Sequence, residues 1–199
     1  MEVQEAVARI SEIHAQLIKS EVFRGYRSWP MGATGALAVL AAALQTTIWP
    51  PASRTDFAVF WLLVAGVAGL VCCGDLAHGY LRATSASARR RTRYALGQFA
   101  PALVAGVVTT ACLLESAPDL LPGLWCLFFA LGLFSSRLHL PRQVGWVALW
   151  YLVAGTVLLW NLSGVPSPWG MGFSFGGGQL ALAFVFLTRI ERQEHGCSR

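Results

Sequence analysis

Two polar residues with metal-binding side chains stand at the end of an apolar stretch. Asp75 and His78 are three positions apart, which places them one turn apart on a helix, and Cys72 and Cys73 directly precede this pair. Cys, His and Asp all bind transition metals, so Asp75 and His78 are the candidate metal ligands of the chain. A closed metal site needs about four placed ligands, and no second cluster accompanies these residues. The alternative is an Asp–His pair at a membrane surface, and the sequence predicts no bound metal or cofactor.

Amides and glycines interrupt other apolar stretches. The residues that could line a polar cavity are Gln45, Gln98, Gln179, Gly176, Gly177 and Gly178. Glycine interruptions of a membrane helix mark the binding sites of some transporters. However, amide side chains also hydrogen-bond neighbouring helices, and glycines also permit two helices to cross closely. The residue types leave both interpretations open.

The composition of the chain indicates which elements carry these residues. Hydrophobic residues make up 55% of the chain and charged residues 13%, whereas a soluble domain carries about 25% charged residues. A helix needs about 20 apolar residues to cross a hydrocarbon core of about 30 Å. Six stretches have this length or come close to it: 31–49, 57–74, 95–114, 121–134, 144–162 and 171–187. We therefore expect an all-α fold in which residues 29–190 form a polytopic bundle of six transmembrane helices.

The positive charges predict how this bundle is oriented. Of the 15 Lys and Arg residues, only Arg54 falls on one side of the expected membrane, and all the others fall on the opposite side. Because cytoplasmic loops are enriched in Lys and Arg, both termini, including the tail 191–199, are expected in the cytoplasm. The expected location is the inner (plasma) membrane. The basic loops also account for the net charge of +5, so no nucleic-acid partner is expected.

The bundle also divides into three hairpins, over residues 29–80, 94–138 and 143–190. Each hairpin begins after an arginine-bearing stretch and reverses in a polar or proline-containing turn. An internal repeat would produce this pattern. The charge rule alone would produce it in any protein with six spans.

Residues 1–28 predict an amphipathic helix on the cytoplasmic side. Its apolar stripe consists of Val3, Val7, Ile10, Ile13 and Leu17. The polar face is net acidic, whereas helices that bind a membrane surface are usually rich in Lys and Arg. We therefore expect the stripe to contact protein, which could be the bundle's own cytoplasmic face, a second copy of the chain or another subunit.

A basic cluster lies between the second and third expected spans. It contains Arg89, Arg90, Arg91 and Arg93. Basic residues next to a membrane span attract anionic lipid headgroups, so we expect this cluster to bind them. Nucleic acid is the alternative ligand, but no aromatic platform for stacking bases accompanies the arginines.

Several short segments resemble an uncharacterised family of bacterial six-span integral membrane proteins. They are Ile10-Ser11-Glu12-Ile13, Gly123-Leu124-Trp125, and Phe175-Gly176-Gly177-Gly178-Gln179 with Arg189 after it. The resemblance implies six spans over nearly the whole chain. The family often has His where this chain has Gln179, so the resemblance implies no ligand role at that position. The family has no established activity.

Three classes of function fit the sequence. The first is a non-catalytic membrane protein, a subunit, anchor or regulator that acts through helix–helix contacts, and the lack of a catalytic constellation favours it. Its partners would be the lipid bilayer and either a second copy or a larger membrane complex. The second class is a small-molecule or ion transporter or channel, which would need a polar cavity. The third is a haem- or quinone-linked membrane protein or enzyme, which would need the cytoplasmic Asp and His residues to converge.

Overall fold

The computed structural model of the chain describes residues 28–82, 86–137, 140–162 and 165–188 and, within these, all side chains except those of 82–96. The regular elements in these ranges are helices, and no strand occurs among them, so the predicted all-α class is confirmed. Most of the predicted N-terminal helix and the whole of the tail 191–199 lie outside the described residues.

Five long helices are followed by a sixth that is divided into three parts. The long helices are α2 (Ser28–Thr47), α3 (Arg54–Arg82), α4 (Ala86–Leu113), α5 (Leu121–Ser136) and α6 (Val144–Trp160). A short 3-10 turn, η1 (Pro118–Leu120), leads directly into α5. The last helical stretch consists of α7 (Pro168–Met171), a π-helical segment η3 (Gly172–Gly177) and α8 (Gly178–Phe186).

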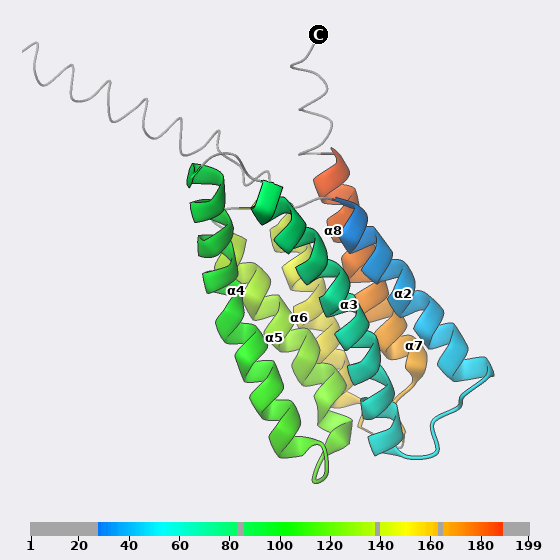
Figure 1. Cartoon of the computed structure of the whole chain (residues 1–199). Helices are drawn as coiled ribbons and strands as arrows, with labels where there is room; N and C mark the ends of the chain where they lie inside the picture. Colours follow the sequence, from blue (N-terminus) through cyan, green and yellow to red (C-terminus); the bar gives the residue numbers. More distant parts are fainter. Residues whose placement is uncertain (1–27, 83–85, 138–139, 163–164, 189–199) are drawn as a thin grey trace, which may run out of the picture.

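Successive helices run in opposite directions along a common axis (Figure 1). The start of α2, the end of α3, the start of α4 and the end of α8 lie at one end of the bundle, and the turns after α2, α4 and α6 lie at the other. α5 packs between α4 and α6, while α2 packs mainly along α7, η3 and α8. α3 has its main helix contact with α2 and touches α4 only slightly. The neighbour order is therefore α4, α5, α6, α8, α2 and α3.

Two groups of buried side chains hold the helices together. One lies between α5, α6 and α8 and includes Cys126, Tyr151 and Leu182. The other lies between α2, α3 and α7 and includes Phe57 and Met171. At the contact of α5 with α6, the backbones approach so closely that a Cβ added at Gly155 would lie 2.8 Å from the Gly123 carbonyl oxygen. Such close approach is the usual role of glycine between membrane helices.

Proline and serine mark several helix starts. Pro118 and Pro168 occupy the first turns of η1 and α7, where a missing backbone donor costs little. At the start of α3, the backbone N–H of Asp56 donates to Ser53 Oγ over 3.0 Å, which is a side-chain cap of the helix. Five of the six predicted spans begin within three residues of an observed helix, whereas α4 begins at Ala86, nine residues before the predicted start at 95.

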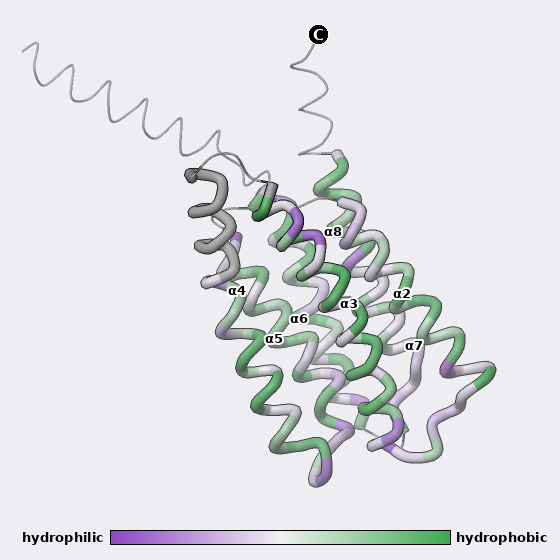
Figure 2. Tube along the Cα trace, viewed as in Figure 1, coloured by the Kyte–Doolittle hydropathy of each residue, from purple (hydrophilic) through white to green (hydrophobic). Residues whose placement is uncertain are grey.

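The hydropathy of the helices matches a membrane environment in part. Apolar residues predominate along the middle of the bundle, and much of the polar sequence lies at its two ends (Figure 2). By length and composition, two helices could cross a bilayer, over Arg54–Leu81 and Pro118–Ser136, and shorter apolar helices occupy Gly97–Leu113 and Val144–Trp160. The described chain is thus a helical bundle that contains two helices long and apolar enough to span a membrane.

Candidate functional site

Indole donors join neighbouring helices inside the bundle. The Trp61 indole N–H of α3 donates to Gln45 Oε1 of α2 over 2.8 Å, and both side chains are buried. The Trp125 indole N–H of α5 donates to Thr110 Oγ1 of α4, also over 2.8 Å. A polar group buried in an apolar interior is costly unless it is hydrogen-bonded. These bonds therefore give Gln45 Oε1 and Thr110 Oγ1 a hydrogen-bond donor. They also link α2 to α3 and α4 to α5 at one defined position each.

Two further donors join α6 to the π-helical segment η3. The Trp150 indole N–H donates to the Ser174 carbonyl over 3.1 Å, and the Tyr151 hydroxyl donates to the Phe175 carbonyl over 3.4 Å. A carbonyl oxygen has two lone pairs, so it can accept from a side chain as well as from the backbone. π-helical turns are rare and often occur at functional sites. Here Trp150 and Tyr151, which are consecutive in α6, each donate a hydrogen bond to the π-helical segment.

The glycine run lies at close helix contacts. A Cβ added at Gly178 would lie 2.5 Å from Cε2 of Tyr151, and one added at Gly176 would lie 2.6 Å from Cγ2 of Val39. Gly177 has more room, with the Trp150 ring 3.4 Å from its added Cβ. The run thus faces α2 on one side and α6 on the other. At Gly176 and Gly178 the backbone therefore approaches the neighbouring helices closely.

The three glutamines predicted to line a cavity come from three different helices. Gln45 of α2 bonds to Trp61, as described above. Gln179 of α8 is 9% exposed, packs against Gly35 of α2, and its Oε1 is buried without a hydrogen-bond partner. Gln98 lies on α4 and is partly buried. The structure therefore brings Gln179 to the α2–α8 contact and Gln45 to the α2–α3 contact, and it does not gather the three around one space.

Asp75 and His78, the candidate metal ligands, lie in a shallow cavity at the end of the α2–α3 pair. The Trp29 indole N–H donates to Asp75 Oδ1 over 3.1 Å. The cavity measures about 480 Å³ and is lined by Trp29, Leu70, Val71, Gly74, Asp75 and His78. Among the residues that the structure describes, no group of three or more His, Cys, Asp and Glu side chains is placed to hold a metal ion. Asp75 and His78 thus form part of a mixed site that contains a carboxylate, an imidazole and an indole.

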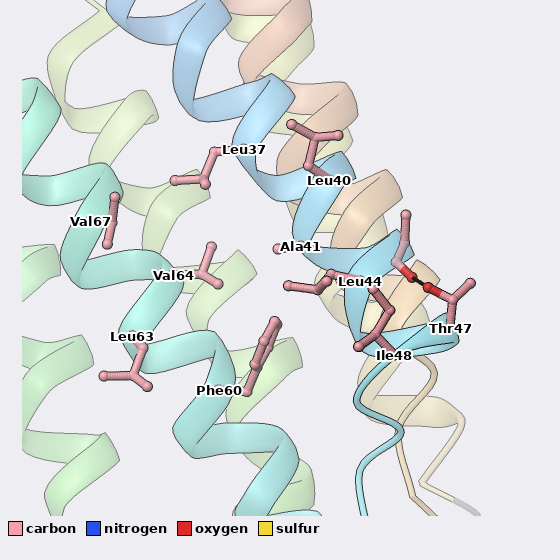
Figure 3. A pocket seen from close by; sticks show the side chains of 11 residues that line it. Leu37, Leu40, Ala41, Leu44, Thr47, Ile48, Phe60, Leu63, Val64 and Val67 are labelled. Carbon is pink, nitrogen blue, oxygen red and sulfur yellow. Dashed lines mark hydrogen bonds between the residues drawn. The ribbon is translucent and has the colours of Figure 1, made fainter.

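A second, apolar groove runs along the same two helices. It measures about 540 Å³ and its wall includes Leu37, Leu40 and Leu44 of α2 and Phe60, Val64 and Val67 of α3. Figure 3 shows Leu37 and Leu44 of α2 and Phe60 and Val64 of α3 in the space between the two helices. The groove is open to the surroundings and its lining is almost wholly hydrocarbon, which suits an apolar occupant.

An ion pair holds the opposite end of α3. Arg54 Nη1 lies 3.2 Å from Asp119 Oδ2, which joins the start of α3 to η1. The cysteines of the described ranges, Cys72, Cys73, Cys112 and Cys126, are free thiols.

Two predicted sites fall outside the described parts of the chain. The partner-contact stripe of Val3, Val7, Ile10, Ile13 and Leu17 lies wholly outside the described residues. Arg89, Arg90, Arg91 and Arg93 lie on the first turns of α4, but their side chains are outside the description. Both sites therefore stay predictions.

Comparisons with known proteins identified no relative. No family model matches the chain. No curated protein and no solved structure matches it either. The resemblance to the bacterial six-span family therefore also stays a prediction.

The sequence did not predict the hydrogen bonds that tryptophans donate to neighbouring helices. Tryptophans are enriched at the two membrane interfaces, so hydropathy alone suggests positions at the ends of spans. Trp61 and Trp150 instead lie inside helices and donate hydrogen bonds to a neighbouring helix. A signal was present, since an indole N–H in an apolar segment needs an acceptor. The sequence does not say which helix provides that acceptor.

Proposed function

We propose that this protein is a non-catalytic integral membrane protein of the bacterial inner membrane that acts as a subunit, anchor or regulator through helix–helix contacts. In this proposal the chain crosses the bilayer six times, once with each long helix and once with the α7–η3–α8 stretch. Both termini are cytoplasmic, as the distribution of Lys and Arg predicts.

The exposed apolar surface is the observation that carries the proposal. Leu63 and Leu70, in the middle of α3, are 67% and 76% exposed, and Val107, in the second half of α4, is 70% exposed. Soluble monomers rarely expose continuous apolar surface of this kind. Lipid chains or apolar helices of a partner would cover it.

The interior of the bundle supports a structural role. Gln45 and Thr110 are bonded to tryptophans of adjacent helices, and Gly176 and Gly178 face packed side chains. These polar groups and glycines link helices to one another, and among the described residues no group of three or more His, Cys, Asp and Glu side chains is placed to hold a metal ion. Side chains arranged in this way stabilise one helix packing without providing a reaction centre.

The two sites outside the described side chains complete the proposal. The N-terminal stripe provides the contact with a second copy or another subunit. The arginines at the start of α4 bind anionic headgroups and hold that end of the bundle at the cytoplasmic surface.

Purification in a mild detergent tests the proposed function. We expect the wild-type chain to elute as a stoichiometric complex, with a second copy or with a distinct subunit, as measured by light scattering and native mass spectrometry. Replacing Ile10 and Ile13 by Glu should release the chain as a monomer, because the substitution interrupts the apolar stripe. The matched control replaces Glu5 and Glu12 of the polar face by Gln and should leave the complex intact.

Two results would contradict the proposal. One is a wild-type chain that is monomeric in detergent, in which case no partner contact exists to be disrupted. The other is a purified sample with haem absorbance in the Soret region, which would favour the redox alternative.

A further inference from the structure

We propose that α3 is a pivoting helix. Its first two turns are anchored in the bundle, and the remainder, which we call the arm, moves toward and away from α2. The movement closes and opens the hollows between the two helices. This inference depends on the packing of α3 alone, so it goes beyond the proposed function and requires no partner.

The anchor of α3 is well packed. Phe57 and Ala58 are completely buried, and the buried Trp61 indole donates to Gln45 of α2. The ion pair of Arg54 joins the same end of α3 to η1. Both apolar burial and polar contacts therefore hold the first two turns in place.

The arm, by contrast, has little packing. The structure describes every side chain from Leu62 to Leu81, and none of them is buried, whereas buried residues recur along α2. A Cβ added at Gly66, Gly69 or Gly74 would meet no atom within 4 Å. Segments with few buried contacts are the ones that open locally at low cost in free energy.

Two hollows separate the arm from α2. The apolar groove of about 540 Å³ extends from Phe60 to Val67 of α3, and the cavity of about 480 Å³ extends from Leu70 to His78 (Figure 3 shows the groove). Atoms that face a void lack contacts on that side, so close packing does not fix the separation of the two helices there. On its other side α2 is tightly held, since a Cβ added at Gly35 would lie 3.0 Å from a backbone nitrogen of α8. We therefore expect α3, and not α2, to move.

The far end of the arm is joined to α2 at the surface of the bundle. There the exposed Trp29 indole donates to Asp75. A hydrogen bond at a surface is readily exchanged for bonds to water, so its net contribution is small. It stabilises the position that the structure records and still permits the arm to leave it.

The length of the arm determines how far its end can move. Ala77 lies 16 positions after Trp61, which is about 24 Å along a helix. Crossing angles within one class of helix packing vary by about 15–20°, and a tilt of about 15° moves Ala77 by about 6 Å. An ordinary packed helix fluctuates by only about 1 Å.

Distances between spin labels test the pivot. The labels are attached to cysteines introduced at exposed positions of a variant whose five native cysteines are alanines. The test pair is Trp146 of α6 with Ala77 of the arm, and the reference pairs are Trp146 with Ala36 of α2 and Thr156 of α6 with Thr55 of the anchor. By double electron–electron resonance in a mild detergent, we expect the distance distribution of the test pair to be about 6 Å broader than those of both reference pairs.

Two matched substitutions test whether the hollows permit the movement. Gly74 lines the second hollow, so Gly74→Leu should give the arm apolar contacts with α2 and narrow the test distribution to the width of the reference pairs. Gly69 lines neither hollow, so Gly69→Leu adds the same side chain to the same helix and should leave the distribution broad. Every variant is compared with the wild type in elution volume and thermal midpoint, so that misfolded samples are recognised.

Three results would overturn the inference. A test distribution as narrow as that of the Trp146–Ala36 pair would show that the arm does not move. Equal broadening of the Thr156–Thr55 pair would show that α3 moves as a whole and has no anchor. Equal narrowing by Gly69→Leu and Gly74→Leu would show that the stiffness of the helix, and not the hollow, limits the movement.

Discussion

Tryptophan has two roles in this bundle, and its position decides which one. Trp160 is 87% exposed at the end of α6, as expected of a ring in an interfacial belt. Trp61 is 3% exposed and donates to the buried amide of Gln45. The first ring contacts the surroundings, and the second donates to an amide oxygen that is buried in an apolar interior.

The Trp61–Gln45 bond should contribute measurably to stability. Replacing Trp61 by Phe keeps an aromatic ring but leaves Gln45 Oε1 buried without a donor, so we expect a loss of about 1–2 kcal/mol in the free energy of unfolding. Unfolding by SDS in mixed micelles, followed by circular dichroism, measures this loss. The matched control Trp160→Phe should cost less than about 0.5 kcal/mol, because surface substitutions away from such features have small effects.

A double variant tests the physical reason. Gln45→Leu together with Trp61→Phe removes both polar partners, and it should be more stable than Trp61→Phe alone. Equal losses for Trp61→Phe and Trp160→Phe would show that the buried bond makes no net contribution.

The sequence identified the polar residues of the candidate site but not the side chains that they contact. Gln45, Gln179, Asp75 and His78 stand out in the sequence because polar groups are rare in apolar stretches. Their contacts depend on which helices are neighbours. Trp29 and Asp75 are 46 positions apart, and hydropathy carries no information about a pairing over that distance.

At the scale of helices, glycine positions determine where two helices meet. The ring of Tyr151 occupies the place where Gly178 would carry a side chain, and from there its hydroxyl reaches the carbonyl of Phe175. By contrast, a Cβ added at Gly66 of α3 would meet no atom within 4 Å. Glycine is thus required by packing on α8, whereas nothing in the described structure requires it at position 66.

Substitution of these glycines by alanine should give opposite results. Gly178→Ala forces the Tyr151 ring to move and should destabilise the fold by about 1–3 kcal/mol, as overpacking does. Gly66→Ala should stabilise α3 by about 0.5–1 kcal/mol, because alanine loses less backbone entropy in a helix. Thermal unfolding in detergent, monitored by circular dichroism, measures both changes.

The neighbouring glycine provides the control for this experiment. Gly177→Ala brings a methyl group to ordinary contact distance, 3.4 Å from the Trp150 ring, so it should keep the entropic gain of alanine in a helix and stabilise the fold by up to about 1 kcal/mol. If Gly178→Ala and Gly177→Ala unfold at the same temperature, the close contact with Tyr151 does not constrain the helix.

Helix positions were predictable from apolar length, and helix geometry was not. The stretch 144–162 predicted α6 (Val144–Trp160) within two residues. The stretch 57–74 is shorter than α3, because backbone hydrogen bonding continues past the apolar residues to Arg82. The π-helical turns of η3 were missed, since hydropathy does not record whether a backbone bond closes over four residues or five.

At the scale of the whole molecule, the alternating helix directions agree with the proposed six spans. The turns near Pro51, Ser116 and Val165 lie at one end of the bundle (Figure 1). The ends of α3 and α5 lie at the other end, which faces the cytoplasm in the proposed topology. Each turn should therefore be accessible from only one side of the membrane.

Reporter fusions should reproduce this alternation. Alkaline phosphatase, which is active only outside the cytoplasm, should be active when fused after Pro51, Ser116 or Val165. It should be inactive when fused after residue 84, 139 or 199, and a fluorescent protein that folds in the cytoplasm should give the inverse pattern. High phosphatase activity at both ends of one hairpin would rule out the proposed topology.

The neighbour order could not be read from the sequence. The predicted hairpins 29–80, 94–138 and 143–190 contain helices that are consecutive in the chain, and α4 does pack on α5 within the second of them. The most extensive contacts, however, join different hairpins: α5 with α6, and α2 with the α7–η3–α8 stretch. Hydropathy gives the number and direction of the helices, whereas the small residues that allow close approach decide which ones touch.

The pairing of α2 with α7, η3 and α8 has a consequence for biosynthesis. The first described helix to leave the ribosome has its main partner in the last helix to be made. Until translation is nearly complete, the side of α2 that packs on Gly172 and Gly176 lacks its native packing partner. A nascent chain arrested before Pro168 should therefore have an incomplete tertiary fold, and it would depend on lipid or an insertion chaperone to shield that surface.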